Sequence, residues 1–333
     1  MTAPRVTVVS VPRERFSFSV RSLRSILEHT DGPYELVVVD GGSPRRVARQ
    51  LARAAHSHGF PLIRMDRYLS PNEARNLGLA AAQTEYIVFV DNDVVVHPGW
   101  LSPLVACADE NDAAVVGPLT CIGEPLGETI HFAGGEVRII ENGDGGAKTR
   151  HVKDRMWHPN RKVAKVADEL KRQPCELAEF HTVLARTEVL RSIGGFDEEM
   201  LNTREHLDFC LGVARAGGSV WFEPASVVTY VPGPPFALPD IPFYMLRWSD
   251  DWERRSLQHF RQKWDLADDE FFQRRLGRLG WRRDMSLLKP FSRRVTLGRR
   301  GSGRVEAALR RPERVLNRFL TDRYRRERAR SAA

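Results

Sequence analysis

Three short, almost wholly apolar runs near the start of the chain alternate with three helical patterns, and this alternation limits the fold more than any other feature. The apolar runs cover residues 6–9, 36–39 and 86–90. Runs that are rich in β-branched residues and apolar on both faces are typical of buried parallel strands. Helical crossovers between parallel strands are right-handed, so the pattern predicts an α/β fold with a parallel sheet covered on both faces.

Apolar residues spaced three or four positions apart predict the helices between these strands. The first pattern spans residues 20–27, and the second spans 47–55. A third helix is indicated by Ser70, Pro71 and Glu73, which supply an N-cap, a proline at the first helical position and a glutamate three residues after the cap. Ligands of such sheets bind at the carboxyl ends of the strands, so we expect functional side chains directly after the strands.

Acidic residues follow two of the three predicted strands. Asp91, Asn92 and Asp93 follow the third strand. Two carboxylates at a strand end, separated by one residue, suit a divalent cation, Mn²⁺ or Mg²⁺, that bridges the oxygens of a diphosphate. Asp40 follows the second strand, where it is placed to accept hydrogen bonds from a base or a ribose. The competing interpretation of these aspartates is a structural role as turn or capping residues.

Two polar residues of the third predicted helix, Arg75 and Asn76, lie just upstream of the Asp-x-Asp strand. We expect them to contact the ribose or the phosphates of a bound nucleotide. For Arg75, a surface ion pair is the alternative.

A later helix, which ends at Gly217 and Gly218, carries three candidate general bases in its first turn. Thr203 is its predicted N-cap, followed by Glu205, His206 and Asp208. A carboxylate or an imidazole that faces a cleft is suited to accept the proton of a hydroxyl group. We rank Glu205 first, Asp208 second and His206 third. The alternatives are a favourable interaction of Glu205 with the helix dipole and an ion pair of Asp208 with a neighbouring arginine.

Three further histidines, His97, His131 and His181, are interpreted as local structural residues. None of them has the spacing to another that is typical of metal ligands.

The remaining organisation follows from composition. Residues 118–175 combine poor periodicity with Gly-rich turns and many charges, which predicts a long mobile loop or lid. A Pro-rich segment over 231–242 marks the edge of the main domain. We therefore expect a catalytic domain over residues 1–240 and a helical, arginine-rich C-terminal extension over residues 241–333.

The charge is concentrated in the last part of the chain. Of the 51 Lys and Arg residues, 20 lie in residues 271–333, together with only 5 of the 43 Asp and Glu residues. This predicts peripheral contact with an anionic membrane, while a solvated helical tail is the alternative. The part beyond about residue 285 is expected to be dispensable for chemistry. The sequence shows neither a pattern typical of a signal peptide nor a long apolar run. We therefore expect a cytoplasmic protein, with or without peripheral contact at the inner face of the membrane.

Five motifs, taken in order, resemble those of the bacterial family 2 glycosyltransferases of the GT-A fold, and the resemblance covers roughly residues 5–230. They are VVVDGGS at 37–43, ARNLG at 74–78, FVDNDV at 89–94, GGFDE at 194–198 and EHLD at 205–208. The resemblance implies a GT-A-like nucleotide-binding fold with a mainly parallel sheet. It also implies that Asp40 binds the nucleobase, that Asp91 and Asp93 serve ribose and metal, and that the Glu205 segment supplies the acceptor-side base.

The chain departs from the family pattern at two places. His206 stands where many relatives have the second residue of an acidic pair, which leaves the identity of the base open. Inversion is the default of the family, but retaining relatives of the same fold share a non-acidic residue at this position. Near Thr229 or Tyr230, many relatives place a metal-binding histidine, so the metal here has fewer protein ligands or is dispensable.

The implied function is transfer of a sugar from a nucleotide-diphosphate sugar to a hydroxyl acceptor, such as a glycan, a lipid-linked or a small-molecule acceptor, by an inverting and metal-dependent reaction. One alternative is a nucleotidyltransferase that makes sugar nucleotides. It is disfavoured because residues 11–16, after the first strand, contain no glycine for a phosphate loop. The other is a non-catalytic nucleic-acid-binding protein that uses the basic tail. It is disfavoured because the acidic strand-end cluster repels phosphate backbones.

Overall fold

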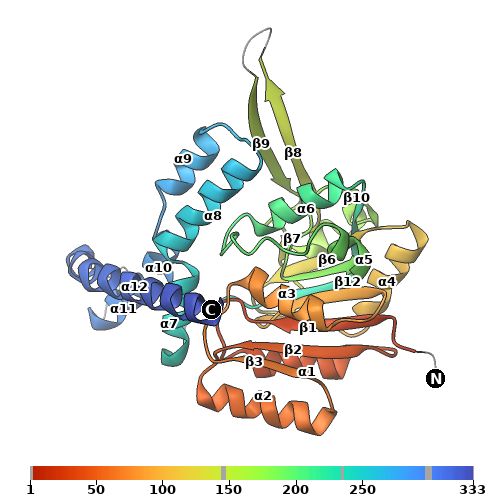
Figure 1. Ribbon diagram of the computed structural model, residues 1–333, viewed down its shortest axis with the longest axis horizontal. Helices are drawn as coiled ribbons and strands as arrows, with labels where there is room; N and C mark the ends of the chain where they lie inside the picture. Colours follow the sequence, from red (N-terminus) through yellow and green to blue (C-terminus); the bar gives the residue numbers. More distant parts are fainter. Residues whose placement is uncertain (1–2, 144–147, 234–235, 297–301, 333) are drawn as a thin grey trace.

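A mixed sheet forms the centre of the molecule (Figure 1). The computed structural model of the chain describes residues 3–143, 148–233, 236–296 and 302–332. Within these residues, eight strands follow the order β10-β12-β6-β11-β4-β1-β2-β3, while β5 pairs with β12 and β7 pairs with β6. The strands are β1 (Val6–Val11), β2 (Glu35–Gly41), β3 (Leu62–Met65), β4 (Tyr86–Asp91), β5 (Val94–Val96), β6 (Val115–Ile122), β7 (Ile130–Phe132), β8 (Gly135–Asn142), β9 (Thr149–Met156), β10 (Gln173–Cys175), β11 (Thr182–Arg186) and β12 (Val220–Tyr230).

Helices cover the sheet and form the C-terminal extension. Those of the α/β part are α1 (Ser19–His29), α2 (Arg45–His58), α3 (Pro71–Ala81), α4 (Leu101–Glu110), α5 (Thr187–Ser192) and α6 (Glu205–Arg215). Those of the extension are α7 (Ile241–Arg247), α8 (Asp250–Lys263), α9 (Glu270–Leu276), α10 (Trp281–Arg283), α11 (Lys289–Val295) and α12 (Gly303–Ala332). None of the described helices is long and apolar enough to cross a membrane.

The predicted parallel sheet is confirmed in the first part of the chain. β3, β2, β1 and β4 pair in parallel, and β11 runs antiparallel between β4 and β6. Successive strand residues alternate between two hydrophobic clusters on the opposite faces of the sheet. One cluster contains Val9 and Phe89 with residues of α3 and α6, and the other contains Val8 and Val88 with residues of α1, α2 and α4. This double burial explains why both faces of these strands are apolar.

The two predicted helix starts had different outcomes. Ser70 caps α3, because its hydroxyl accepts the N–H of Glu73 at 3.4 Å, as predicted. The prediction that Thr203 caps the later helix was wrong. α6 begins at Glu205, and Arg204 adopts a left-handed backbone conformation with φ of 66° before it. The hydroxyl of Thr203 accepts a hydrogen bond from the guanidinium of Arg204 instead.

The prediction of a long mobile loop over residues 118–175 was wrong. The segment contains most of β6, all of β7 and β10, and the antiparallel hairpin of β8 and β9, which projects from the body toward α9 in Figure 1. Few residues of the hairpin are buried, and Val137 and Val152 are its buried hydrophobic side chains. With so few buried positions, the sequence shows little period-two alternation. The predicted Gly-rich turn falls partly at 144–147, outside the described residues.

The C-terminal extension is helical, as predicted, and packs beside the carboxyl ends of the strands. Asp240, the residue just before the extension, accepts hydrogen bonds from the backbone N–H groups of Phe16 and Ser17 at 2.9 and 3.0 Å, which ties the start of the extension to the loop after β1. On α12, Tyr324 is 2 % exposed, and its ring centroid lies 4.8 Å from that of Trp252 on α8. Tyr324 thus packs the part beyond residue 285 onto α8, and the expectation that this part is dispensable for chemistry stays a prediction.

Candidate active site

Asp91, the last residue of β4, lies at the centre of a buried ionic cluster. Its Oδ2 accepts a hydrogen bond from Nη1 of Arg13 at 2.7 Å, and its Oδ1 accepts one from Nη2 of Arg75 at 3.1 Å. Asn92 fixes the segment after β1, because its side chain accepts the N–H of Arg13 and donates to the carbonyl of Arg15. β1 and β4 are parallel neighbours, so the residues that follow them meet at one edge of the sheet.

Asp93, in the turn between β4 and β5, has an unpaired buried carboxylate. The residue is 1 % exposed, and neither side-chain oxygen has a hydrogen-bond partner among the described residues. Burial raises the pKa of Asp93 well above its ordinary range, and the charge of Arg13 opposes this shift. Buried polar atoms in proteins normally have a hydrogen-bond partner. A carboxylate without a partner at this strand end therefore fits a divalent cation.

Asp91 and Asp93 differ in how much of each carboxylate remains available to a cation. Asp91, Asp93 and His181 each offer one ligand atom, and these atoms lie within 4.8 Å of one another. Asp91 already accepts hydrogen bonds from two guanidinium groups, whereas both oxygens of Asp93 are unpaired. Asp93 is therefore the better placed of the two predicted metal ligands.

Arg75 and Asn76 point to different partners. Arg75 is fully buried against Asp91, and its guanidinium lies 4.2 Å from the ring centroid of Phe180, so it is not a surface residue. Asn76 instead donates to the carbonyl of Phe196 at 2.8 Å and to Glu198 at 2.9 Å. The structure thus brings Arg75 to the acidic strand end and places Asn76 in a clamp on the segment after α5.

Asp40 is buried at the end of β2 and is held in a turn. Its Oδ1 accepts the N–H of Ser43 at 2.9 Å, and its Oδ2 accepts the hydroxyl of Ser43 at 2.8 Å and also pairs with Arg64. The side chain of Arg64 is 34 % exposed, so it forms the solvent side of this group. Both carboxylate oxygens of Asp40 are therefore engaged within the protein.

Glu205 is buried in the first turn of α6 and is paired with the extension. Its Oε1 lies 3.0 Å from Nη2 of Arg247 on α7. Burial alone would raise the pKa of Glu205, but the charges of Arg247 and its neighbours outweigh burial and lower the pKa to about 2. A carboxylate with so low a pKa is a weak proton acceptor.

Asp208 is also bound to the extension. It accepts a hydrogen bond from Nε1 of Trp264 at 2.8 Å and one from Nζ of Lys263 at 2.8 Å. Burial raises the pKa of Asp208, and the charge of Lys263 opposes the shift. The partners of Asp208 are thus the last residue of α8, Lys263, and the residue that follows it, Trp264.

His206 is the candidate base with the most accessible side chain. It is partly exposed, whereas Glu205 and Asp208 are each 5 % exposed. Burial lowers the pKa of His206, although the nearby Glu179 carboxylate opposes the shift. An imidazole with a lowered pKa is neutral at physiological pH and is able to accept a proton. These contacts favour His206 over Glu205 and Asp208, and the identity of the base stays a prediction.

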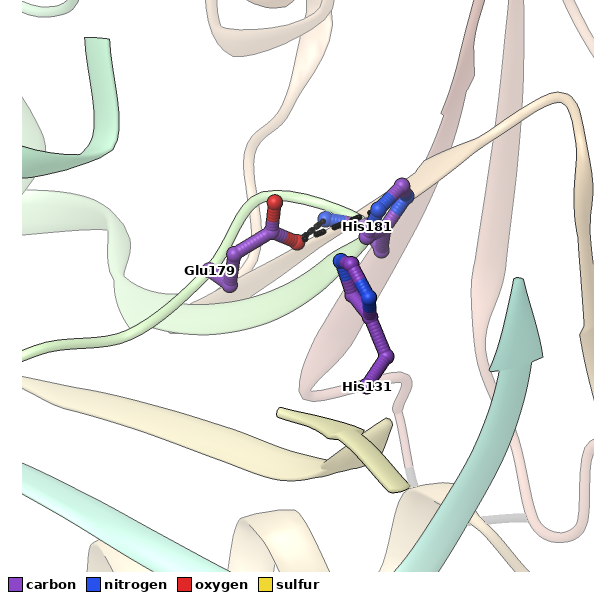
Figure 2. Close-up of side chains that lie close together, drawn as sticks. All are labelled: His131, Glu179 and His181. Atoms are coloured by element: carbon purple, nitrogen blue, oxygen red, sulfur yellow. Dashed lines mark hydrogen bonds and ion pairs between the residues drawn. The ribbon is translucent and has the colours of Figure 1, made fainter. Parts of the chain in front are cut away.

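Two of the histidines that we interpreted as structural belong to a cluster with a glutamate (Figure 2). His131 comes from β7, Glu179 from the loop before β11, and His181 from the residue just before β11. One ligand atom of each lies within 4.8 Å of those of the other two. The charges of His181, Arg13 and His131 outweigh the effect of burial and lower the pKa of Glu179 to about 2. His131 is far from Glu179 and His181 in the sequence, so the sequence alone did not indicate that these three residues form a cluster.

His97, by contrast, has a local partner. Its Nε2 lies 2.9 Å from the hydroxyl of Thr229, in the strand pair of β5 and β12. This hydrogen bond agrees with the structural interpretation.

The sequence analysis also missed the buried charges of Arg13, Glu14 and Arg15. All three are at most 9 % exposed and lie in the loop after β1. The sequence did contain an indication of them. Three consecutive charged residues follow a buried strand after a single proline, at the edge of the sheet where ligands bind.

Comparisons with known proteins show that this chain is similar to glycosyltransferases. The family model described as "Glycosyl transferase family 2" matches residues 13–150. The "Pre-mycofactocin glycosyltransferase" of Mycobacterium tuberculosis is 26% identical over 225 residues, which make up 68% of this chain and 42% of that protein. "Polypeptide N-acetylgalactosaminyltransferase 12" of Mus musculus is 29% identical over 238 residues, or 67% of this chain and 39% of that protein. The chain thus spans about two fifths of the length of these relatives.

A solved structure confirms the fold. The crystal structure of GalNAc-T7 with UDP, GalNAc and Mn²⁺ covers 85% of this chain with a TM-score of 0.53, at 16% sequence identity and over 58% of its own length. The GT-A-like fold expected from the motifs is therefore confirmed.

Proposed function

We propose that this chain, whose residues 13–150 match the model of glycosyl transferase family 2, transfers a sugar from a nucleotide-diphosphate sugar to a hydroxyl acceptor. The observation that carries the proposal is the unpaired, buried carboxylate of Asp93 at the end of β4. In a sheet of this topology, the carboxyl ends of the strands are where ligands bind. The relatives support the reaction class, because both are named as glycosyltransferases.

The donor end of the proposed site is formed by β1, β2 and β4. Asp93 would hold a divalent cation, Mn²⁺ or Mg²⁺, which neutralises charge on the diphosphate leaving group. Arg13 and Arg75 orient Asp91 beside it through their hydrogen bonds to both of its oxygens. Asp40 forms the nucleoside end, where a base or ribose would displace the partly exposed Arg64.

The acceptor end is formed by the first turn of α6. In our proposal, the acceptor hydroxyl oxygen attacks the anomeric carbon opposite the departing nucleotide, so the reaction inverts the configuration. The bond between the anomeric carbon and the phosphate oxygen breaks, its electron pair leaves with the nucleoside diphosphate, and the hydroxyl proton moves to His206. Glu205, held by Arg247, positions this turn.

A donor screen tests this function. The full chain is titrated with UDP-, GDP- and dTDP-sugars by calorimetry, with and without Mn²⁺, and positive donors are then mixed with hydroxyl acceptors. We expect one nucleotide to bind with an affinity that Mn²⁺ increases. Absence of binding for every donor, with and without the ion, would contradict the proposal.

We also propose that the C-terminal extension contacts an anionic membrane surface. On α12, Val315, Leu316 and Phe319 are 68, 45 and 55 % exposed. Exposed arginines lie beside them at positions 311, 314 and 318. An apolar stripe flanked by arginine is suited to the headgroup region of an anionic bilayer. Binding to lipid vesicles tests this surface, as described in the Discussion.

A further inference from the structure

The side chains of His131, Glu179 and His181 converge from two segments, β7 and the loop just before β11, as Figure 2 shows. Nε2 of His181 lies 3.5 Å from Oε2 of Glu179, and the ring centroids of His131 and His181 are 5.0 Å apart. On its other side, Nδ1 of His181 lies 3.5 Å from Oδ2 of Asp91. The imidazole of His181 is therefore flanked by two carboxylates.

The backbone N–H of His181 donates to Oε2 of Glu179 at 3.1 Å, but no hydrogen bond explains the position of its imidazole ring. It is 0 % exposed, and neither ring nitrogen has a hydrogen-bond partner among the described residues. A neutral imidazole carries one N–H and one lone pair. Only one of its two flanking carboxylates can face the N–H, and the lone pair then points at the other carboxylate. A cation between the lone pair and that carboxylate removes the repulsion.

Asp91 is the better partner for the N–H. Histidines that bind metals usually donate their second ring nitrogen to a carboxylate, which fixes the ring. The buried carboxylate of Asp91, itself held by Arg13 and Arg75, matches this outer position. Nε2 is then left as a ligand atom on the side of Glu179 and His131. Tyr230 stacks on the His181 ring with a centroid distance of 4.0 Å and supplies a packed wall.

We propose that His131, Glu179 and Nε2 of His181 bind a transition-metal dication such as Zn²⁺, at a site separate from the cation on Asp93. Two imidazoles and one carboxylate are a ligand set that Zn²⁺ favours, whereas Mg²⁺ favours oxygen ligands. Three protein ligands leave a coordination position open. His131 and Glu179 are partly exposed, so water or an acceptor hydroxyl would reach the open position from the side of these two residues.

Metal binding by the full chain tests the inference without donor or acceptor. The purified protein is stripped with a chelator and titrated with Zn²⁺ and with Co²⁺. Bound metal is measured by mass spectrometry after desalting, and the visible spectrum of Co²⁺ reports imidazole ligation. The test variants are His131→Ala and Glu179→Gln. Their matched controls are His97→Ala, a histidine bonded to Thr229, and Glu176→Gln, a glutamate of the same loop that pairs with Arg138.

We expect the unmodified chain and both controls to bind one Zn²⁺ at this site. Each test variant should weaken Zn²⁺ binding by more than the roughly 10–100-fold that loss of an outer partner of a metal site costs. Asp93→Ala should keep the Zn²⁺. Absence of Zn²⁺ and Co²⁺ binding by the unmodified chain, or undiminished binding by both test variants, would overturn the inference. Loss of all Zn²⁺ binding in Asp93→Ala would also overturn it, because the ion would then belong to the donor site.

The inference and the proposed sugar transfer fail in different ways. Zn²⁺ bound by His131 and Glu179 in a chain that binds no nucleotide sugar would leave the metal site intact and contradict the transfer. Mn²⁺-dependent donor binding in a chain that binds no Zn²⁺ would do the reverse.

Discussion

Oε1 of Glu205 lies 3.0 Å from Nη2 of Arg247, and both side chains are buried. This pair joins the first turn of α6 to α7, so the C-terminal extension holds the proposed acceptor end of the site. Asp208 repeats the connection through Trp264 and Lys263. The boundary that we predicted at residue 240 therefore lies between two parts that are joined by buried contacts of α6 with the extension.

Arg247→Ala should destabilise the fold strongly. It leaves the carboxylate of Glu205 buried without its partner, and breaking a buried ion pair in this way costs about 3–5 kcal/mol. Thermal unfolding measures the effect. Arg254→Ala, which removes an exposed arginine of α8, is the control and should change stability by less than about 0.5 kcal/mol. Equal melting temperatures for the two variants would contradict a stabilising role of the pair.

Glu205 should also make stability depend on acid. Its folded-state pKa of about 2 lies below the ordinary value of about 4.3 for glutamate. The stability linked to this shift is present above about pH 4.3 and is lost as the pH falls toward 2. Urea unfolding between pH 6 and pH 3 should therefore show a smaller acid-induced loss in Glu205→Gln than in the unmodified chain. An identical pH dependence would mean that the ion pair does not set the pKa.

His206→Ala should lower kcat by about 10²–10⁴-fold with little change in donor affinity, because general base catalysis contributes this much. The base must be unprotonated, and the pKa of His206 lies below its ordinary value of about 6.5. The turnover of the unmodified chain should thus be retained from neutral pH down to about 6.5 and should fall only at a lower pH. His58→Ala, an exposed histidine of α2, controls for the substitution. If the turnover of His206→Ala equals that of this control, the general base is a residue other than His206.

Tyr324→Ala should destabilise the chain by about 3–5 kcal/mol, as is usual for a buried aromatic residue. The ring is 2 % exposed against Trp252, so the substitution leaves a cavity between α12 and α8. Phe319→Ala on the same helix is the matched control, because that ring is 55 % exposed. Similar melting temperatures for the Tyr324 variant and the unmodified chain would contradict a stabilising role of this contact.

The membrane surface is tested with a variant that keeps the fold. Arg314→Glu and Arg318→Glu together reverse two exposed charges beside Leu316 and Phe319. Each basic residue near an anionic leaflet contributes about 1 kcal/mol, so binding to vesicles of phosphatidylglycerol and phosphatidylcholine should weaken by at least about 10-fold. Vesicles of phosphatidylcholine alone give the uncharged reference. Undiminished binding of the double variant to the anionic vesicles would exclude this surface.

The helices and strands that local periodicity determines were predicted correctly from the sequence. β1, β2, β4 and the cap of α3 were found from apolar runs and from Ser70, because these signals lie within a few residues of one another. β3 was missed because the strand is short and only partly buried at the sheet edge. The hairpin of β8 and β9 was missed because most of its residues face solvent.

The site was less predictable because its partners come from distant segments. The Asp-x-Asp strand end was visible in the sequence, but the unpaired state of Asp93 follows from packing around it. The pairing of Glu205 with Arg247 joins residues 42 positions apart, so the sequence did not indicate that this candidate base is engaged in a buried ion pair. His131 and His181 meet only because β7 pairs with β6, which lies beside β11.

Calorimetric titration of Asp93→Ala with the nucleoside diphosphate of the preferred donor and Mn²⁺ tests the central claim most directly. Asp66→Ala is the matched control, since the side chain of Asp66 is 99% exposed. Asp93→Ala should fold, because it removes a buried carboxylate that has no hydrogen-bond partner among the described residues, and circular dichroism confirms this separately. We predict that Mn²⁺ strengthens nucleotide binding to the unmodified chain and to Asp66→Ala but leaves binding to Asp93→Ala unchanged. An equal gain from Mn²⁺ in the folded Asp93→Ala protein would contradict the account.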